Sequence, residues 1–119
     1  MQNLIFPMEK NISWQDFAKI EMRVGTILTA SHFDKARNPA YIVTIDFGSH
    51  GIKKSSAQIT TLYDIETLIG QQVVAVVNFP PKQIANIMSE CLILGAVGDD
   101  KTVTLLTTEQ PVANGTLIG

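Results

Sequence analysis

The stretch YIVTIDF, residues 41–47, alternates apolar and polar side chains, and it is the clearest strand pattern in the chain. Side chains of an extended strand point to opposite faces in turn, so Thr44 and Asp46 share one face. The apolar members Tyr41, Val43, Ile45 and Phe47 share the other face. The GSHG that follows, residues 48–51, indicates a turn. This period of two predicts a β-strand with one face against a core.

Other segments extend the β-rich pattern. From Ile20 the chain again has a period of two, and Gly25 predicts a bulge or sharp bend in that strand. The continuous apolar run QQVVAVVNF, residues 71–79, predicts a strand buried on both faces. The segments CLILGAV, GDDK and TVTLLTT, residues 91–108, predict a hairpin whose turn is GDDK. The closing segment 110–119 carries the turn pair Asn114-Gly115.

Two short helices are expected among these strands. Ser13 with Asp16 three residues later forms a weak capping box, and Trp14 and Phe17 then share one helical face. A second helix is expected before Gly70, a helix stop. Its apolar residues Leu62, Ile65, Leu68 and Ile69 recur at helical spacing.

The order of these elements predicts an all-β fold with short helices. We expect a five-stranded OB-fold (oligonucleotide/oligosaccharide-binding) barrel with a short N-terminal helix, a helix between strands 3 and 4, and a C-terminal extension. Another small Greek-key barrel is the alternative. The domain is expected to cover residues 13–119, after an N-terminal arm of residues 1–12 that is a candidate for flexibility.

Length and composition narrow the class of protein. At 119 residues the chain is long enough for one domain with a real core. Its net charge of −2 argues against a dedicated nucleic-acid binder, although a local basic patch remains open. The single cysteine, Cys91, excludes an intrachain disulfide framework. Because no apolar run is long enough for a membrane span and no basic leader precedes one, we expect a cytoplasmic protein without membrane insertion.

Catalytic patterns are sparse. His32 and His50 lack the spacings of metal-binding histidines, and Cys91 lies in an apolar strand where a small buried side chain is the simpler interpretation. The pair Asp99-Asp100 fits a hairpin turn, and no glycine-rich phosphate loop occurs. The sequence therefore predicts a protein that is not an enzyme and needs no cofactor or metal.

Two polar segments are candidates for binding. In the strand KKSSAQIT, alternation places Lys54, Ser56 and Gln58 on one face, opposite the face of Lys53, Ser55, Ala57 and Ile59. The hydrogen-bonding face could hold a ligand, and the alternative is a face that simply contacts solvent.

The second candidate is the segment NFPPKQIANIM, residues 78–88, which is expected to be a loop stiffened by Pro80 and Pro81. A stiff loop loses less entropy on binding. Its apolar residues Phe79, Ile84, Ile87 and Met88 lie beside the polar Lys82, Gln83 and Asn86. The alternative is that Phe79 and Ile84 cap the end of the barrel.

Six segments together resemble the CsaA-type export-related chaperones of the tRNA-binding domain superfamily, which also includes C-terminal domains of some methionyl- and phenylalanyl-tRNA synthetases. They are IEMRVGTILTA, VTIDFG, KKSSAQITTLY, QQVVAVVNFPPKQI, SECLILGAV and QPVANGTLIG. SSAQIT and VVNFPP are the most specific parts. The resemblance covers residues 13–119. It implies an OB-type barrel, a symmetric homodimer, binding of unfolded or presecretory polypeptides, and contact with the export machinery.

The wider superfamily implies tRNA binding through an asparagine followed by a serine in an S-x-G-M-type motif. Asn78 and Ser89 match that asparagine and serine, whereas Cys91 and Leu92 stand where glycine and methionine are usual. This departure, together with the acidic net charge, favours the CsaA branch.

The resulting function hypothesis is a peptide-binding chaperone that assists protein export. The alternative is a tRNA-binding module acting in trans, for which the basic residues should gather on one face: Arg23, Arg37, Lys53, Lys54 and Lys82. A dimeric scaffold with some other ligand is a third hypothesis. The candidate ligand-binding residues are Asn78, Phe79, Lys82, Gln83, Ile84, Ser89, Lys54, Ser56, Gln58 and Arg37.

The two ends of the chain carry more apolar side chains than a small barrel is expected to cover. These residues are the candidate homodimer interface: Trp14, Phe17, Pro111, Val112, Leu117 and Ile118. The alternative is that the helix and the tail pack on their own barrel, since a small domain needs cover.

Overall fold

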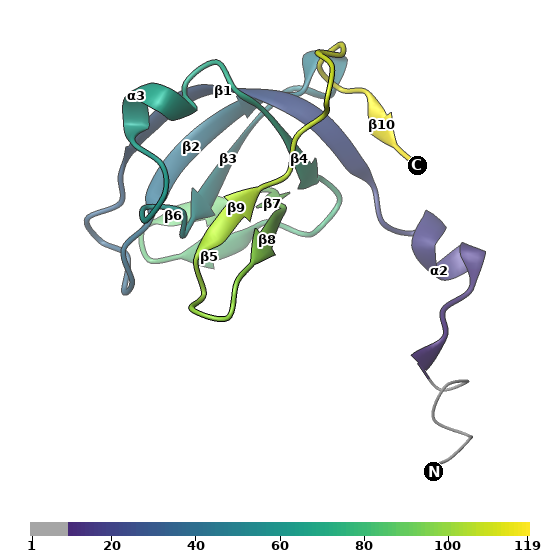
Figure 1. Cartoon of the computed structure of the whole chain (residues 1–119), viewed down its shortest axis with the longest axis horizontal. Helices are drawn as coiled ribbons and strands as arrows, with labels where there is room; N and C mark the ends of the chain where they lie inside the picture. Colours follow the sequence, from purple (N-terminus) through teal and green to yellow (C-terminus); the bar gives the residue numbers. More distant parts are fainter. Residues whose placement is uncertain (1–9) are drawn as a thin grey trace.

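The computed structural model describes residues 10–119, which form a nearly closed barrel of five antiparallel strands (Figure 1). The hydrogen-bonded order is β3 (Ile52–Ala57), β2 (Tyr41–Asp46), β1 (Met22–His32), β4 (Gln72–Val76) and β7 (Leu92–Ile93). The predicted all-β, OB-like architecture is confirmed. The expected arm of residues 1–12 lies mostly outside the described residues.

The buried side chains of the core are those that the strand patterns predict. In β2, buried side chains alternate with partly exposed ones, and Val43, Ile45 and the following Phe47 are completely buried. Strand β4 is buried at Val73, Val74, Ala75 and Val76, so it is covered on both faces. After β2 the chain turns through the one-turn 3-10 helix η1 (Gly48–His50), at the expected turn.

Gly25 was predicted to mark a bulge or a sharp bend, and the bulge is wrong at this position, because the register of β1 against β4 is unbroken from Met22 to Thr26. The register of β1 against β2 shifts between Ile27 and Thr29 instead. At Gly25 a Cβ atom would lie 2.6 Å from Ile45 Cγ2 and 2.7 Å from Phe47 Cδ1. The glycine therefore makes room for core side chains that approach the backbone of β1.

The helices are shorter than expected. In α2 (Trp14–Ala18) the capping box is present, because the Asp16 amide donates to Ser13 Oγ and the Ser13 amide donates to Asp16 Oδ2. Helix α3 (Ile65–Leu68) is a single turn that buries Leu68. The predicted apolar stripe is wrong at Leu62 and Ile69, which are about half exposed and lie outside the helix.

Two connections differ from the prediction. The segment expected to be a loop is a hairpin of β5 (Lys82–Ile84) and β6 (Ile87–Ser89), with Ala85 at a φ of 49° in its turn. The hairpin expected over residues 91–108 is divided between two sheets. Its first part, β7, pairs with β4, and only β8 (Gly95–Val97) pairs with β9 (Val103–Leu105).

The C-terminal tail is attached to its own barrel. Strand β10 (Leu117–Ile118) pairs with β1, and the Gln72 side chain both donates to the Val112 carbonyl and accepts from the Val112 amide, at 2.7 and 3.1 Å. Helix α2, in contrast, has no buried residue and stands clear of the barrel (Figure 1). The alternative that both chain ends pack on their own barrel is therefore confirmed for the tail and is wrong for helix α2.

Candidate binding groove

A groove of about 380 Å³ lies where the edge of β3 meets the β5–β6 hairpin and β7. We call it the rim groove. Its lining consists of Ser56, Gln58, Phe79, Pro80, Lys82, Ile84, Ser89, Cys91 and Leu92. A second cleft continues from it along the seam between the end of β3 and β7–β8, and the two share Ser56, Gln58 and Leu92.

Hydrogen bonds from β6 and the residue after it hold one wall of the rim groove against β3. The Glu90 amide donates to the Lys54 carbonyl at 2.7 Å, and the Lys54 amide donates to Glu90 Oε1 at 2.9 Å. The Ser56 amide donates to Ser89 Oγ at 3.2 Å. Two of these three bonds use side-chain oxygens, so β3 and β6 do not form a regular ladder and the barrel stays open at this seam.

The rim groove is mainly apolar. Phe79 is 56% exposed and Leu92 is 49% exposed, so both present apolar surface outside the core. Gln58 and Ser56 add hydrogen-bonding groups, and Lys82 is the lining residue with a charge. This combination can accept an apolar side chain while neighbouring polar groups bond to an extended backbone.

Cys91 forms part of the groove lining and is almost completely buried, at 6% exposure. Burial raises the pKa of its thiol to about 11, against a smaller opposing effect of the Ser55 hydroxyl. At neutral pH the thiol is therefore protonated and a poor nucleophile. Within residues 10–119, no group of three or more His, Cys, Asp or Glu side chains could hold a metal ion.

The structure brings together many of the predicted ligand-binding residues. Those that line the rim groove are Phe79, Lys82, Ile84, Ser89, Ser56 and Gln58. Lys54 lies beside the groove, joined through its backbone to Glu90. Gln83 lies outside the lining and donates to the Ala85 carbonyl, and Arg37 lies in the connection between β1 and β2, also outside the lining.

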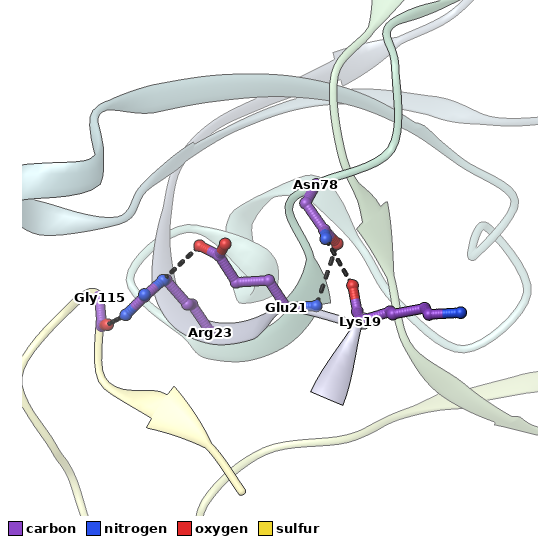
Figure 2. Close-up of polar contacts among 5 residues, drawn as sticks. All are labelled: Lys19, Glu21, Arg23, Asn78 and Gly115. Carbon is purple, nitrogen blue, oxygen red and sulfur yellow. Dashed lines mark hydrogen bonds and ion pairs between the residues drawn. The ribbon is translucent and has the colours of Figure 1, made fainter. Parts of the chain in front are cut away.

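Asn78 lies outside the rim groove, and both ends of its side-chain amide bond to the chain's own backbone (Figure 2). Its Oδ1 accepts from the Glu21 amide at 3.0 Å, and its Nδ2 donates to the Lys19 carbonyl at 2.7 Å. The side chain therefore ties the end of β4 to the junction between α2 and β1.

Three residues of the groove were not among the predicted ligand-binding residues, namely Pro80, Cys91 and Leu92. Pro80 follows Phe79 directly, so its place in the rim could have been inferred from that neighbour. Leu92 alternates with the buried Cys91, and the rule that successive strand residues face opposite sides would have placed it outside the core.

The five basic residues that tRNA binding was expected to need do not all gather on one face, since Lys82 lines the rim groove and Arg23 lines the end cleft. Arg23 forms an ion pair with Glu21, with Nε 2.7 Å from Oε2, and its Nη1 donates to the Gly115 carbonyl. The hydrogen bond from Arg23 lowers the pKa of the Glu21 carboxyl. Lys53 is half-buried, on the face of β3 that also carries the buried Ser55 and Ala57.

The predicted interface residues occupy three places. Trp14, 85% exposed, lines a cleft along α2 that Phe17 shares. A second cleft, which we call the end cleft, lies between the α2–β1 junction and the tail. It is lined by Phe17, Ala18, Lys19, Ile20, Glu21, Arg23, Asn78, Leu117, Ile118 and Gly119. Pro111 borders another cleft, and Val112 is half-buried and bracketed by Gln72.

The described part of the chain contains no helix that is long and apolar enough to cross a membrane.

Residues 22–117 match the family model described as "Putative tRNA binding domain". The solved structure of the chaperone CsaA from Bacillus anthracis is 49% identical, covers 92% of this chain and 99% of its own, and superposes with a TM-score of 0.88. The CsaA chaperone protein from Picrophilus torridus is also 49% identical, covers 92% of this chain and 100% of its own, with a TM-score of 0.86.

Similarity extends to longer proteins. Methionine–tRNA ligase from Leptospira biflexa is 36% identical over 107 residues, which are 90% of this chain and 15% of the ligase. The ligase from Nanoarchaeum equitans is equally identical over 107 residues, 13% of its length. The chain thus spans about a seventh of the curated relatives that it matches.

Proposed function

This chain belongs to the putative tRNA-binding domain family, in its CsaA-type branch, and we propose that it is a chaperone-like protein that binds extended apolar polypeptide segments in the rim groove. Its clients would be unfolded or presecretory polypeptides, which it would keep available for the export machinery in the cytoplasm. The protein acts in this proposal by binding and carries out no catalysis.

The observation that carries this proposal is the exposed apolar surface of the rim groove beside polar side chains. Phe79 and Leu92 offer contact area for an apolar side chain, and Gln58 offers a donor and an acceptor for an extended backbone. The groove has few charges, so it suits apolar segments better than acidic ones. Similarity to CsaA chaperones over nearly their whole length supports the same function.

Substitution of Phe79 tests the proposal. We expect Phe79→Ser to weaken binding of a labelled, unstructured apolar peptide about tenfold, because it removes most of one aromatic contact. Leu62→Ser is the matched control, because Leu62 is 54% exposed, close to the 56% of Phe79, and lies outside the groove lining. Fluorescence anisotropy gives both affinities. Equal losses in the two variants would contradict a peptide site in the groove.

A second candidate function is tRNA binding in trans. The match to the tRNA-binding domain model and the similarity to methionine–tRNA ligases favour it, and Lys82 and Lys54 could contact phosphates. Binding through phosphates weakens steeply as salt rises, because counterions are released, whereas binding through apolar contacts changes little.

A salt series therefore separates the two functions. If tRNA is the ligand, Lys82→Glu weakens its binding and flattens the salt dependence, while the peptide affinity changes less. Lys101→Glu, in the β8–β9 turn, makes the same charge change away from the rim groove. If Lys101→Glu weakens tRNA binding as much as Lys82→Glu does, the loss comes from the changed net charge of the protein, and Lys82 does not contact a phosphate.

We also propose that the protein is a symmetric homodimer joined through its two chain ends. Helix α2 has no buried residue, and Trp14 is 85% exposed. The end cleft brings Phe17 next to Leu117 and Ile118, so apolar groups from both ends of the chain meet on one surface. Sedimentation at micromolar concentration tests this proposal, and a stable species of 13.0 kDa, the mass of one chain, would contradict it.

A further inference from the structure

A continuous series of hydrogen bonds joins three segments that are far apart in the sequence (Figure 2). It begins at the Lys19 carbonyl, which accepts from Asn78 Nδ2, and passes from Asn78 Oδ1 to the Glu21 amide. The Glu21 carboxylate then accepts from Arg23, which also donates to the Gly115 carbonyl at 2.8 Å. The junction before β1, the end of β4 and the C-terminal tail are thereby held together.

Asn78 is the member of this series that restrains helix α2. The helix buries none of its residues against the barrel, so its direction depends on the short junction that follows it. Among the described residues, the hydrogen bonds that fix this junction to the end of β4 are the two Asn78 bonds and one backbone bond, from the Val77 amide to the Glu21 carbonyl at 2.9 Å. The donor bond to Lys19 acts directly at the C-terminal end of α2.

Asn78 also stands between the two surfaces described above. Its side chain lines the end cleft, together with Phe17, Leu117 and Ile118, whereas the next residue, Phe79, lines the rim groove. Its amide oxygen and amide nitrogen both already have backbone partners. Each of these atoms can form one further hydrogen bond, but Asn78 lies outside the lining of the rim groove.

We propose that Asn78 is a positioning residue, which fixes α2 beside the tail across the end cleft, so that the surface of Phe17, Leu117 and Ile118 is preformed for a second copy of the chain. A preformed surface binds more tightly because less conformational entropy is lost on association. The proposal rests on the homodimer proposed above, and it assigns to Asn78 a role in assembly instead of ligand contact.

Asn78→Asp tests this assignment. The substitution keeps the side-chain shape and an acceptor for the Glu21 amide, but it places an oxygen against the Lys19 carbonyl in place of a donor. We expect the dimer dissociation constant to rise about tenfold, the effect of losing one hydrogen bond and leaving its acceptor unpaired. Asn38→Asp is the matched control, because Asn38 is an exposed asparagine in the connection between β1 and β2.

Two measurements are compared for each variant. Sedimentation velocity over a concentration series gives the dimer dissociation constant, and anisotropy of the labelled apolar peptide gives the groove affinity. If Asn78→Asp does not fold, Asn78→Ser, which adds no charge and is too short to bridge both backbone groups, takes its place.

The outcomes separate this inference from the proposed function. A weaker dimer in Asn78→Asp, with an unchanged dimer in Asn38→Asp and an unchanged peptide affinity in both, supports the positioning role. Weaker peptide or tRNA binding with an unchanged dimer would overturn it and would make Asn78 a ligand contact. An unchanged dimer with unchanged binding would also overturn it, while the homodimer itself would stand. A wild-type protein that is monomeric would instead refute the proposed homodimer, and the inference with it.

Discussion

Raising the pH through the titration range of Cys91 should destabilise the folded protein. Burial raises the pKa of this thiol from 9.0 to about 11, so the folded state keeps the proton that the unfolded chain loses first. A group whose pKa is raised on folding stabilises the protein fully below its unfolded pKa. That stabilisation is lost as pH rises toward the folded pKa. The loss should therefore fall between about pH 9 and 11.

The magnitude follows from the separation of the two pKa values. Each unit of difference corresponds to about 1.4 kcal/mol, so the full loss approaches about 3 kcal/mol above the folded pKa. At about pH 10, midway between the two values, the free energy of unfolding should have fallen by about 1.4 kcal/mol through Cys91 alone. At about pH 8 the contribution of Cys91 is negligible.

Urea unfolding near pH 8 and near pH 10 measures this effect in the wild type and in Cys91→Val, which has no thiol to titrate. Other groups also titrate in this range, but they contribute equally to both proteins, so the difference between the two pH-induced losses isolates Cys91. Cys91→Ala is the second variant, in case valine overfills the site. Peptide binding near pH 8 should be retained in both variants, because Cys91 is only 6% exposed and offers the groove little contact surface.

Equal pH-induced losses in the wild type and in Cys91→Val would refute this reasoning, because they would show that the thiol ionises as freely in the folded state as in the unfolded chain. Rapid alkylation gives an independent check. With a pKa near 11 the thiolate fraction near pH 8 is about a hundredth of that of a thiol at 9.0, so folded Cys91 should react about a hundredfold more slowly. Loss of peptide binding with an unchanged melting temperature would contradict the structural role.

Two further predictions concern the barrel and its tail. Gly25→Ala should lower the free energy of unfolding by about 1–3 kcal/mol, because the added Cβ would lie 2.6 Å from Ile45 Cγ2 in a filled core. Gly119→Ala is the control, because a Cβ added there would have no atom within 4 Å. Equal thermal stability of both variants would contradict the packing argument. Deletion of residues 111–119 removes β10 and the partners of Gln72, so sedimentation should show monomer or aggregate, and a truncated protein that stays dimeric would place the interface elsewhere on the barrel.

Much of the barrel could be predicted because its patterns are local. The alternation in residues 41–47 and the apolar run from residue 71 report directly which faces are buried, and both predictions are confirmed. The errors arise where tertiary contacts decide. Gly25 is needed because Phe47 and Ile45 approach from another strand, and no pattern around Gly25 records that approach. The break between β7 and β8 likewise depends on the pairing of β7 with β4.

In the candidate site, too, local patterns predict some residues correctly, whereas tertiary contacts decide the role of others, above all Asn78. Alternation along the polar strand correctly separates Ser56 from the buried Ser55, because that rule is local. For Asn78, the sequence shows a polar residue after an apolar strand and beside a rim residue, which is typical of a ligand contact. Its actual partners, Lys19 and Glu21, lie 59 and 57 residues away in the sequence. An asparagine that bonds to backbone and one that bonds to a ligand are indistinguishable in a single sequence, since both require the same donor and acceptor. Its role therefore has to be decided by whether the dimer or the ligand is lost when the donor is removed.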